Sequence, residues 1–279
     1  MEPFVIIVVL AAAVMHAVWN AVVKIEGDRL MTMAVVISTT GLLAPLLLLA
    51  GPPPASASWP YILLSVLLNN AYFLFLIEAY RFGDLSQVYP IARGSAPLLV
   101  TVGAALFANE QLSIVGLAGV LIISAGTVSL IWNRGFRMGA EKRSIFFALL
   151  TGLMIASYTI IDGIGVRLSG NPAAYIGWLF ILSPLPLASI AILRRRSQAF
   201  VYIRNNWKPA VLGGCLNIGS YGLSIWALSL AAMGHVSAMR ETSVIIAALI
   251  GTQLLGESFG RHRIIAAVAV AFGVVLIAL

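Results

Sequence analysis

The stretch Tyr89-Pro90-Ile91-Ala92-Arg93-Gly94-Ser95-Ala96-Pro97 opens an apolar segment that continues to Ala108 and carries one arginine inside it. Pro90 and Pro97 each remove a backbone hydrogen-bond donor from the helix that this segment would form. If the segment lies in a membrane, the carbonyl groups left free around Arg93 must face a cavity or other protein atoms. A guanidinium at such depth costs about 2.5–3.5 kcal/mol on insertion scales and usually marks a functional site.

The composition is that of a membrane protein. Of the 279 residues, 61% are hydrophobic and 10% are charged, whereas soluble domains carry about 25% charged residues. The mean hydropathy is +1.00 and the pI is 9.9. Because the basic residues lie mostly between the apolar segments, the positive charge indicates membrane orientation rather than nucleic-acid binding. The single cysteine, Cys215, excludes a disulfide within the chain.

Ten apolar segments, each near the ~20 residues that a helical span needs, are separated by turn residues or interfacial tryptophans. They predict membrane-spanning helices at 3–23, 30–50, 59–80, 86–107, 111–132, 144–164, 172–193, 208–229, 235–255 and 261–279. The first segment has no basic region before it and no clear cleavage site, so we expect a retained helix rather than a signal peptide. The predicted fold is an all-α membrane protein without a separate soluble domain.

An internal repeat divides the chain. Four pairs of residues recur at one offset of 147 positions: Asn70 and Asn217, Arg93 and Arg240, Glu110 and Glu257, and Gly126 and Gly273. The offset defines two five-helix repeats, residues 1–133 and 144–279. Because five is an odd number, we expect the second copy to be inverted in the membrane. Inverted repeats are typical of secondary transporters, whose substrate site lies near the midplane where the copies meet, although channels also contain them.

The distribution of Lys and Arg predicts the orientation. The odd-numbered connections between the ten predicted helices hold fourteen of these residues, and the even-numbered ones hold only Arg167. By the positive-inside rule, the odd connections are cytoplasmic and both termini are non-cytoplasmic.

Polar side chains share single faces of several predicted helices. His16, Trp19 and Asn20 lie on one face of the first helix at about 100° per residue, and we expect them to line a polar cavity. Asn70 and Asn217 hold equivalent positions in the third and eighth helices and are candidates for the same cavity. The alternative for these residues is that they only bond to neighbouring helices within the membrane.

The sixth and eighth helices add aromatic and acidic candidates. Tyr158 is the counterpart of Trp19 at an offset of 139, and Tyr221 follows Asn217 by one turn. Both are predicted to bind substrate. Asp162 shares a face with Tyr158, and it is either a proton-coupling group or an acid solvated near its helix end.

The two arginines are the main candidates for the site. Tyr89 and Arg93 are four residues apart and share a face of the fourth helix, and Arg240 and Glu241 are adjacent in the ninth. All four are predicted to line the cavity, with Glu241 also a candidate for proton coupling. Guanidinium groups match carboxylates and phosphates, so an anionic substrate is expected. The alternative is that the arginines form buried pairs that hold the two copies together.

Enzyme signatures are absent from the sequence. It contains no His-Glu-x-x-His, no Gly-x-Ser-x-Gly and no phosphate-binding loop. The three histidines are too scattered to predict a metal site. We therefore expect neither catalysis nor a cofactor.

The chain resembles a known family. The run Ala-x-x-x-Gly-Asp-Leu-Ser-x-Val-x-Pro from Ala79 to Pro90, followed by Pro97 and an apolar run ending at Glu110, is similar to EamA-type members of the drug/metabolite transporter superfamily. The match to 227–257 is weaker but keeps the final glutamate. The resemblance implies ten transmembrane helices as two inverted five-helix repeats. It also implies a central cavity formed mainly by helices one, three, four, six, eight and nine.

We therefore expect a secondary transporter, driven by a gradient or by exchange, that exports a small polar or anionic metabolite such as an amino acid. The bacterial inner membrane is the expected location. The alternative is a membrane-embedded lipid-processing or assembly protein without a transport cycle. The expected partners are a small-molecule substrate and the lipid bilayer, and no nucleic acid. The substrate, the coupling ion, the direction and the formation of a homodimer stay open.

Overall fold

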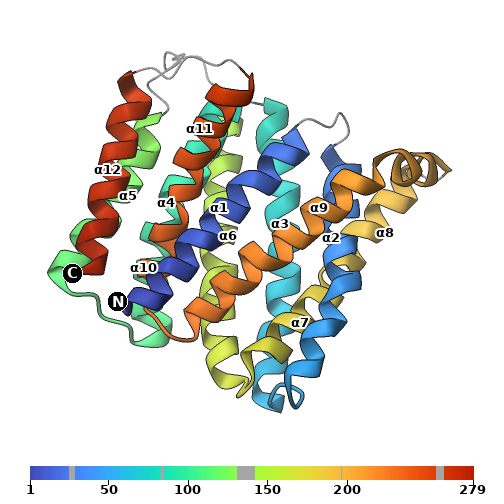
Figure 1. Cartoon of the computed structure of the whole chain (residues 1–279), viewed down its shortest axis with the longest axis horizontal. Helices are drawn as coiled ribbons and strands as arrows, with labels where there is room; N and C mark the ends of the chain where they lie inside the picture. The colour runs from blue at the N-terminus through green and yellow to red at the C-terminus, as the bar shows by residue number, and fades with distance from the viewer. Residues whose placement is uncertain (25–28, 83–84, 131–141, 196, 256–260) are drawn as a thin grey trace.

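The computed structural model describes residues 1–24, 29–82, 85–130, 142–195, 197–255 and 261–279, and these residues form a bundle of helices that contains no strand (Figure 1). The elements are α1 (Pro3–Lys24), α2 (Arg29–Leu43), η1 (Ala44–Ala50), η2 (Ser56–Ser58), α3 (Trp59–Phe82), α4 (Leu85–Ala108), α5 (Ile114–Ser129), α6 (Lys142–Leu168), α7 (Pro172–Leu182), α8 (Pro184–Arg195), α9 (Ser197–Leu228), α10 (Met233–Arg240), α11 (Thr242–Leu255) and α12 (Arg261–Ala278).

Three of the segments predicted as single helices are interrupted. The segment 30–50 becomes α2 followed by the 3-10 helix η1, whose first turn contains a proline. The segment 172–193 breaks into α7 and α8 at Ser183, because Pro184 cannot donate to the preceding turn. The segment 235–255 breaks into α10 and α11 at Glu241, where the Thr242 hydroxyl bonds to the carbonyl of Met239 at 2.8 Å.

The lengths and composition of the helices establish a multi-pass membrane protein. Six helical segments within the described residues are long and apolar enough to cross a membrane: Leu30–Ala50, Ser56–Ala79, Val88–Ala108, Lys142–Leu168, Pro172–Arg195 and Trp207–Leu228. Shorter apolar helices lie at Pro3–Trp19, Ile114–Ser129 and Ile264–Ala278.

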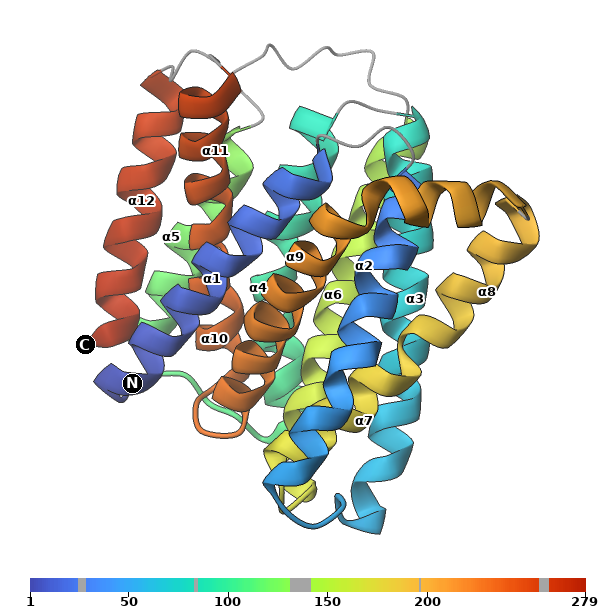
Figure 2. The same ribbon diagram turned by 45° about the vertical axis from the view of Figure 1, so that its right-hand side comes forward.

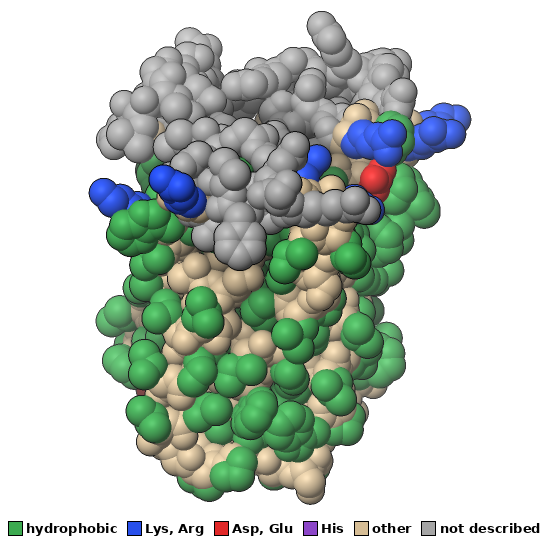
Figure 3. Space-filling view, turned by 90° about the vertical axis from the view of Figure 1, so that its right-hand side faces the viewer, with side chains coloured by type: hydrophobic (Ala, Val, Ile, Leu, Met, Phe, Trp, Pro, Cys, Tyr) green, Lys and Arg blue, Asp and Glu red, His purple; other side chains and the backbone are tan. Residues whose placement is uncertain are grey.

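The outer surface is suited to lipid. Large hydrophobic side chains are well exposed on several helices, among them Leu42, Leu67, Phe107 and Ile192. The face shown in Figure 3 is covered by hydrophobic side chains over most of its height, and Lys and Arg gather near one end of it. A water-facing protein does not expose contiguous apolar surface of this kind.

The two halves of the chain interlock rather than form separate bodies. The helices α3 and α4 of the first half pack against α6 of the second half. In the same way, α9 and α11 of the second half pack against α1 of the first half. At one side of the bundle α5 packs along α12 (Figures 1 and 2). The counterparts in the two halves are α1 and α6, α3 and α9, α4 and the pair α10 with α11, and α5 and α12. When each helix is replaced by its counterpart, the same helix contacts result.

The glycines of α5 and α12 allow these two helices to touch. A Cβ atom added to Gly119 would lie 2.8 Å from the carbonyl oxygen of Gly273, and one added to Gly273 would lie 2.8 Å from that of Gly119. Any side chain at either position would therefore push the backbones apart.

Both chain termini lie at the same end of the bundle, which we call the terminal end (Figure 1). Four contacts join elements there. Glu110, after α4, pairs with Arg167 near the end of α6 at 2.7 Å and accepts from the backbone amide of Met233 at 2.8 Å. Arg167 also donates to the carbonyl oxygens of Leu228 at 2.9 Å and Ala231 at 2.8 Å. Thus α1 and α10 begin at the terminal end, whereas α4, α6 and α9 finish there.

Candidate functional site

A cavity of about 60 Å³ lies between the two halves of the bundle. This volume holds on the order of four water molecules. Its described lining comes from both halves and consists of His16, Trp19, Ile37, Thr40, Asn69, Asn70, Tyr72, Phe73, Arg93, Tyr158, Phe180, Ser183, Asn217, Tyr221 and Arg240. The lining therefore includes two arginines and no acidic residue.

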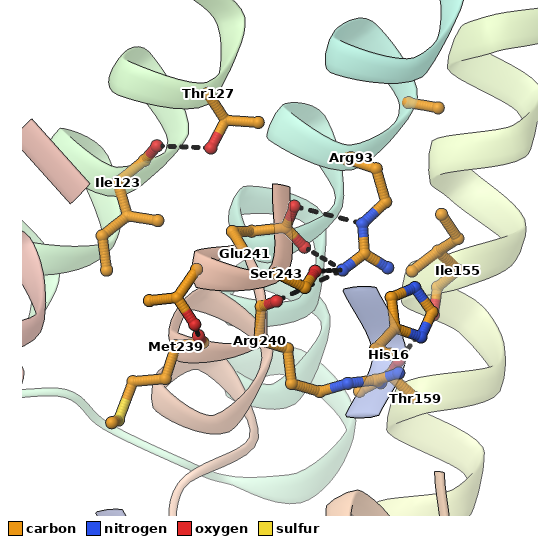
Figure 4. A network of polar contacts seen from close by, with 12 residues as sticks. His16, Arg93, Ile123, Thr127, Ile155, Thr159, Met239, Arg240, Glu241 and Ser243 are labelled. Carbon is orange, nitrogen blue, oxygen red and sulfur yellow. Dashed lines mark hydrogen bonds and ion pairs between the residues drawn. The ribbon is translucent and has the colours of Figure 1, made fainter. Parts of the chain in front are cut away.

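Arg93 is held by an acid from the other half of the chain (Figure 4). Its Nε lies 3.1 Å from one carboxylate oxygen of Glu241, and its Nη2 lies 3.0 Å from the other. The same nitrogen approaches the carbonyl oxygen of Arg240 at 3.5 Å and the hydroxyl of Ser243 at 3.4 Å. Arg93 is 4% exposed and Glu241 is 1% exposed. The charge of Arg93 is thus neutralised inside the protein by a two-point ion pair.

Arg240 is placed differently, although it is the repeat counterpart of Arg93. Its guanidinium carbon lies 5.4 Å from the centroid of the Tyr221 ring, a cation–π contact. No hydrogen bond or ion pair joins this guanidinium to any other residue that the structure describes. Figure 4 shows the side chain extending from α10 away from the Arg93–Glu241 pair. Arg240 is 7% exposed, so a buried positive charge borders the cavity without a direct ion pair to any described acid.

The break between α10 and α11 explains the different roles of neighbouring residues. Arg240 ends α10 and Thr242 begins α11, so Glu241 lies at the junction of the two helices. At this junction Glu241 reaches Arg93 on α4 while Arg240 borders the cavity. Interrupted helices at the midplane are a recurring feature of transporter sites.

Aromatic rings form one wall of the cavity. Tyr158 of α6 stands edge-to-face with Tyr72 of α3, with ring centroids 5.9 Å apart, and with Tyr221 of α9 at 5.7 Å. Phe180 of α7 contacts Tyr221 at 5.8 Å. The rings give the cavity an apolar side.

His16 and Trp19 line the cavity together from α1. The indole nitrogen of Trp19 donates to Nδ1 of His16 at 3.2 Å, and the two rings meet edge-to-face. The side chain of Asn20, predicted to share this face, lies outside the described residues.

The two repeat-related asparagines line the cavity and also join helices. The amide nitrogen of Asn70 donates to the carbonyl oxygens of Val66 at 2.8 Å and Ser183 at 3.2 Å. The second bond gives a donor to the backbone carbonyl at the break between α7 and α8. The amide nitrogen of Asn217 donates to the Thr40 hydroxyl at 3.2 Å. Both of the roles considered for these residues, lining and helix pairing, are therefore present in the geometry.

Three of the predicted site residues are absent from the described lining: Tyr89, Asp162 and Glu241. Tyr89 lies one turn before Arg93 on α4, and Glu241 is occupied by Arg93. Asp162 is fully buried behind the cavity, where it accepts hydrogen bonds from the hydroxyls of Tyr175, at 3.0 Å, and Tyr221.

The second and seventh predicted helices contribute lining residues that the sequence analysis did not select: Ile37, Thr40, Phe180 and Ser183. The available signal was Pro184-Leu185-Pro186 in the middle of an apolar segment, which marks a helix break at membrane depth. The site thus draws on more helices than the resemblance implied.

Within the described ranges, no group of three or more His, Cys, Asp or Glu side chains is arranged to hold a metal ion. The chemistry that the cavity offers is recognition by one positive charge, hydroxyl and amide groups, and aromatic faces.

Comparisons with known proteins agree with this architecture. A family model described as the EamA-like transporter family matches two segments, residues 3–132 and 142–279. No match is found among curated proteins. One solved structure, a crystal structure of a protein, shares the fold with a TM-score of 0.80 over 99% of this chain and 98% of its own, at 16% sequence identity. Because the family match spans nearly the whole chain, the protein belongs to the EamA-like transporter family of the drug/metabolite transporter superfamily.

Proposed function

We propose that the protein is a secondary transporter that carries a small organic anion, with Arg240 as the anchor for the anionic group. The observation that carries this proposal is the Arg240 guanidinium, which is 7% exposed, borders the cavity and forms no direct ion pair with an acid among the described residues. A buried, unpaired cation is costly, and a ligand carboxylate or phosphate would remove that cost.

The charges around the cavity favour an anion over a zwitterion or a cation. Both carboxylate oxygens of Glu241 are taken by Arg93, and Asp162 is covered by the hydroxyls of Tyr175 and Tyr221. A ligand ammonium group would therefore find no free carboxylate in the described lining. The aromatic wall formed by Tyr72, Tyr158, Tyr221 and Phe180 suits a flat or apolar body attached to the anionic group.

We further propose that Arg93 and Glu241 brace the two halves rather than bind substrate. Their two-point pair joins α4 to the junction of α10 and α11, and both partners are almost fully buried. A substrate competing for Arg93 would have to displace Glu241 and leave its carboxylate unpaired.

The proposed transport cycle rests on an inverted-repeat arrangement of ten spans, in which α2 with η1, α7 with α8, and α10 with α11 each form one span. The opposite directions of α1 and α6, and of α4 and α10, at the terminal end support this arrangement. The symmetric exchange of contacts between the halves also supports it. Alternating access then comes from rocking of the two halves around a fixed site. Because the cavity holds only a few water molecules, metabolite entry requires the helices to separate.

The proposed location is the bacterial inner membrane, with both termini on the non-cytoplasmic side. Lys and Arg gather near the upper end of the face in Figure 3, and the termini lie toward the lower end in Figure 1, which supports this orientation.

The first test is a melting-temperature screen of the detergent-solubilised protein with benzoate, benzylamine and phenylalanine, which present one aromatic ring with three different charge states. Mass action stabilises the folded protein by an amount set by ligand affinity. Benzoate should raise the melting temperature most. A larger shift with benzylamine or phenylalanine would overturn the assignment of an anion site, and a shift with anionic phospholipid alone would favour a lipid-handling protein.

The second test measures flux of benzenesulfonate, an aromatic monoanion, from loaded proteoliposomes. Efflux should be saturable, and Arg240→Ala should reduce it at least tenfold, whereas Arg240→Lys should retain part of it. Arg81→Ala is the matched control, because Arg81 is 71% exposed at the side chain and pairs only with nearby Glu78 among the described residues. Equal flux in the Arg240→Ala variant and the control, with equal melting temperatures, would remove Arg240 from the site.

A further inference from the structure

Asp162 is a buried acid that the proposed anion site does not use. It is 0% exposed and lies in the last third of α6. Its carboxylate accepts hydrogen bonds from Tyr175 of α7, Tyr221 of α9 and Ser65 of α3. All three donors are neutral hydroxyls, and no salt bridge joins Asp162 to a cation among the described residues. The oxygens of this carboxylate have hydrogen-bond donors, but its negative charge has no salt-bridge partner among the described residues.

Arg240 is the positive charge linked to Asp162. The Tyr221 ring lies beneath the Arg240 guanidinium, and the Tyr221 hydroxyl donates to Asp162, so one tyrosine connects the two groups. Tyr158, on the same helix as Asp162, also lies near this carboxyl group, but a tyrosine carries no positive charge. Arg93 is already neutralised by Glu241. Arg240 therefore serves both as the counter-charge of Asp162 and as the anchor for an incoming anion.

We propose that anion binding at Arg240 is coupled to uptake of one proton by Asp162, so that the cavity carries the anion and the proton together. The inference rests on the function proposed above. Once an anion occupies Arg240, an ionised Asp162 would lose this counter-charge while still buried. Such a charge is expensive, and the group becomes neutral instead. By thermodynamic reciprocity, a proton on Asp162 strengthens anion binding by the same factor.

The hydrogen-bond geometry provides a place for the proton. Protonated Asp162 can donate from the oxygen that now accepts from Tyr221, and the Tyr221 oxygen becomes the acceptor. The Tyr221 hydroxyl hydrogen, still bonded to its oxygen, then turns toward the cavity, where Tyr221 is a lining residue. The amide nitrogen of Asn69 lies 3.4 Å from the Tyr221 oxygen and helps to hold that ring in position. One proton is taken from water, and no other bond forms or breaks.

The test is isothermal titration calorimetry of the detergent-solubilised protein with benzoate in two buffers that differ in ionisation enthalpy, at several pH values. The difference in heat between the buffers gives the number of protons taken up with each benzoate. Uptake should approach one proton over the range in which Asp162 is ionised in the empty protein. In that range the dissociation constant should rise about tenfold for each unit of pH. Glu78→Gln is the control, since this acid is 40% exposed at its side chain and is not among the described lining residues, and it should not change the result.

Asp162→Asn should keep benzoate binding but abolish both the proton uptake and the dependence on pH. Should that variant fail to fold, Tyr221→Phe provides the second route. It keeps the ring under Arg240 but removes a hydroxyl that stabilises ionised Asp162, so proton uptake at neutral pH should fall. Benzoate binding without proton uptake in the native protein, or unchanged uptake in these variants, overturns the coupling and leaves the anion site intact. Absence of benzoate binding would overturn both proposals.

Discussion

Arg93 and Arg240 occupy equivalent positions in the two copies but differ in what neutralises their charge. Arg93 has a two-point pair with Glu241, and Arg240 has only the face of Tyr221 among the described residues. Two chemically identical side chains thus have different physical roles. Replacing Arg93 is therefore expected to lower stability, whereas replacing Arg240 is expected to weaken binding of the proposed ligand.

Replacing Arg93 with methionine should lower the free energy of unfolding by about 3–5 kcal/mol, because Glu241 would remain buried without a partner. The double change Arg93→Met with Glu241→Leu should recover most of that loss, since it removes both charges. Chemical unfolding in detergent measures the difference. Arg81→Met is the control, because an exposed pair contributes only about 0–1 kcal/mol. A double variant as unstable as Arg93→Met alone would contradict the bracing role.

The sequence identified both arginines as centres of the fold, but it left open which one was paired. Adjacent residues such as Arg240 and Glu241 point about 100° apart on a continuous helix, and their true partners depend on the break after α10. Asp162 was selected as a coupling candidate from its position beside Tyr158. Its enclosure by Tyr175 and Tyr221 depends on contacts between helices that no local pattern contains.

At the scale of the element, broken helices place polar backbone at membrane depth. Pro184 ends α7, and the carbonyl of Ser183 is satisfied by Asn70 from the other half of the chain. Apolar periodicity predicted one helix here because the hydrophobic run is continuous. The proline was visible in the sequence, but whether it bends or divides a helix depends on the helices that pack around it.

The contact of α5 with α12 gives a prediction at the same scale. Gly273→Ala should destabilise the protein by about 1–3 kcal/mol, because the added Cβ meets the backbone oxygen of Gly119 and backbone cannot move aside cheaply. Gly222→Ala is the matched control. Its Cβ would meet only ordinary contacts at 3.4 Å and beyond, and alanine favours a helix over glycine by about 1 kcal/mol.

Unfolding of both variants in detergent should therefore give changes of opposite sign. Equal changes would mean that α5 and α12 can separate without cost. The repeat offset had linked Gly126 with Gly273, but it did not show that Gly273 meets Gly119. The pairing of the last helix in each half depends on how the two copies assemble.

At the scale of the whole molecule, the two halves are interlocked, with each half packing its first helix against the other half. An all-helical membrane fold with two family repeats could be predicted from composition and from the 147-residue offset. The enclosure of the cavity could not, because it requires the relative position of α1, α3, α6 and α9.

The proposed orientation predicts the outcome of a fusion experiment. Alkaline phosphatase, which is active only outside the cytoplasm, should be active when fused after Leu279. The same enzyme inserted after Arg195, at the end of α8, should be inactive, because that end lies opposite the termini. Activity in the reverse pattern would invert the proposed topology.

Arg167 sets an energy barrier at the terminal end. It binds Glu110 and the carbonyl oxygens of Leu228 and Ala231, while Glu110 holds the first amide of α10. Hydrogen bonds to charged groups contribute about 1.5–3 kcal/mol each, and every 1.4 kcal/mol slows a step tenfold. Exposing the cavity at this end must break several of these bonds together. In the proposed transport cycle, these contacts therefore set the barrier to opening of the terminal end.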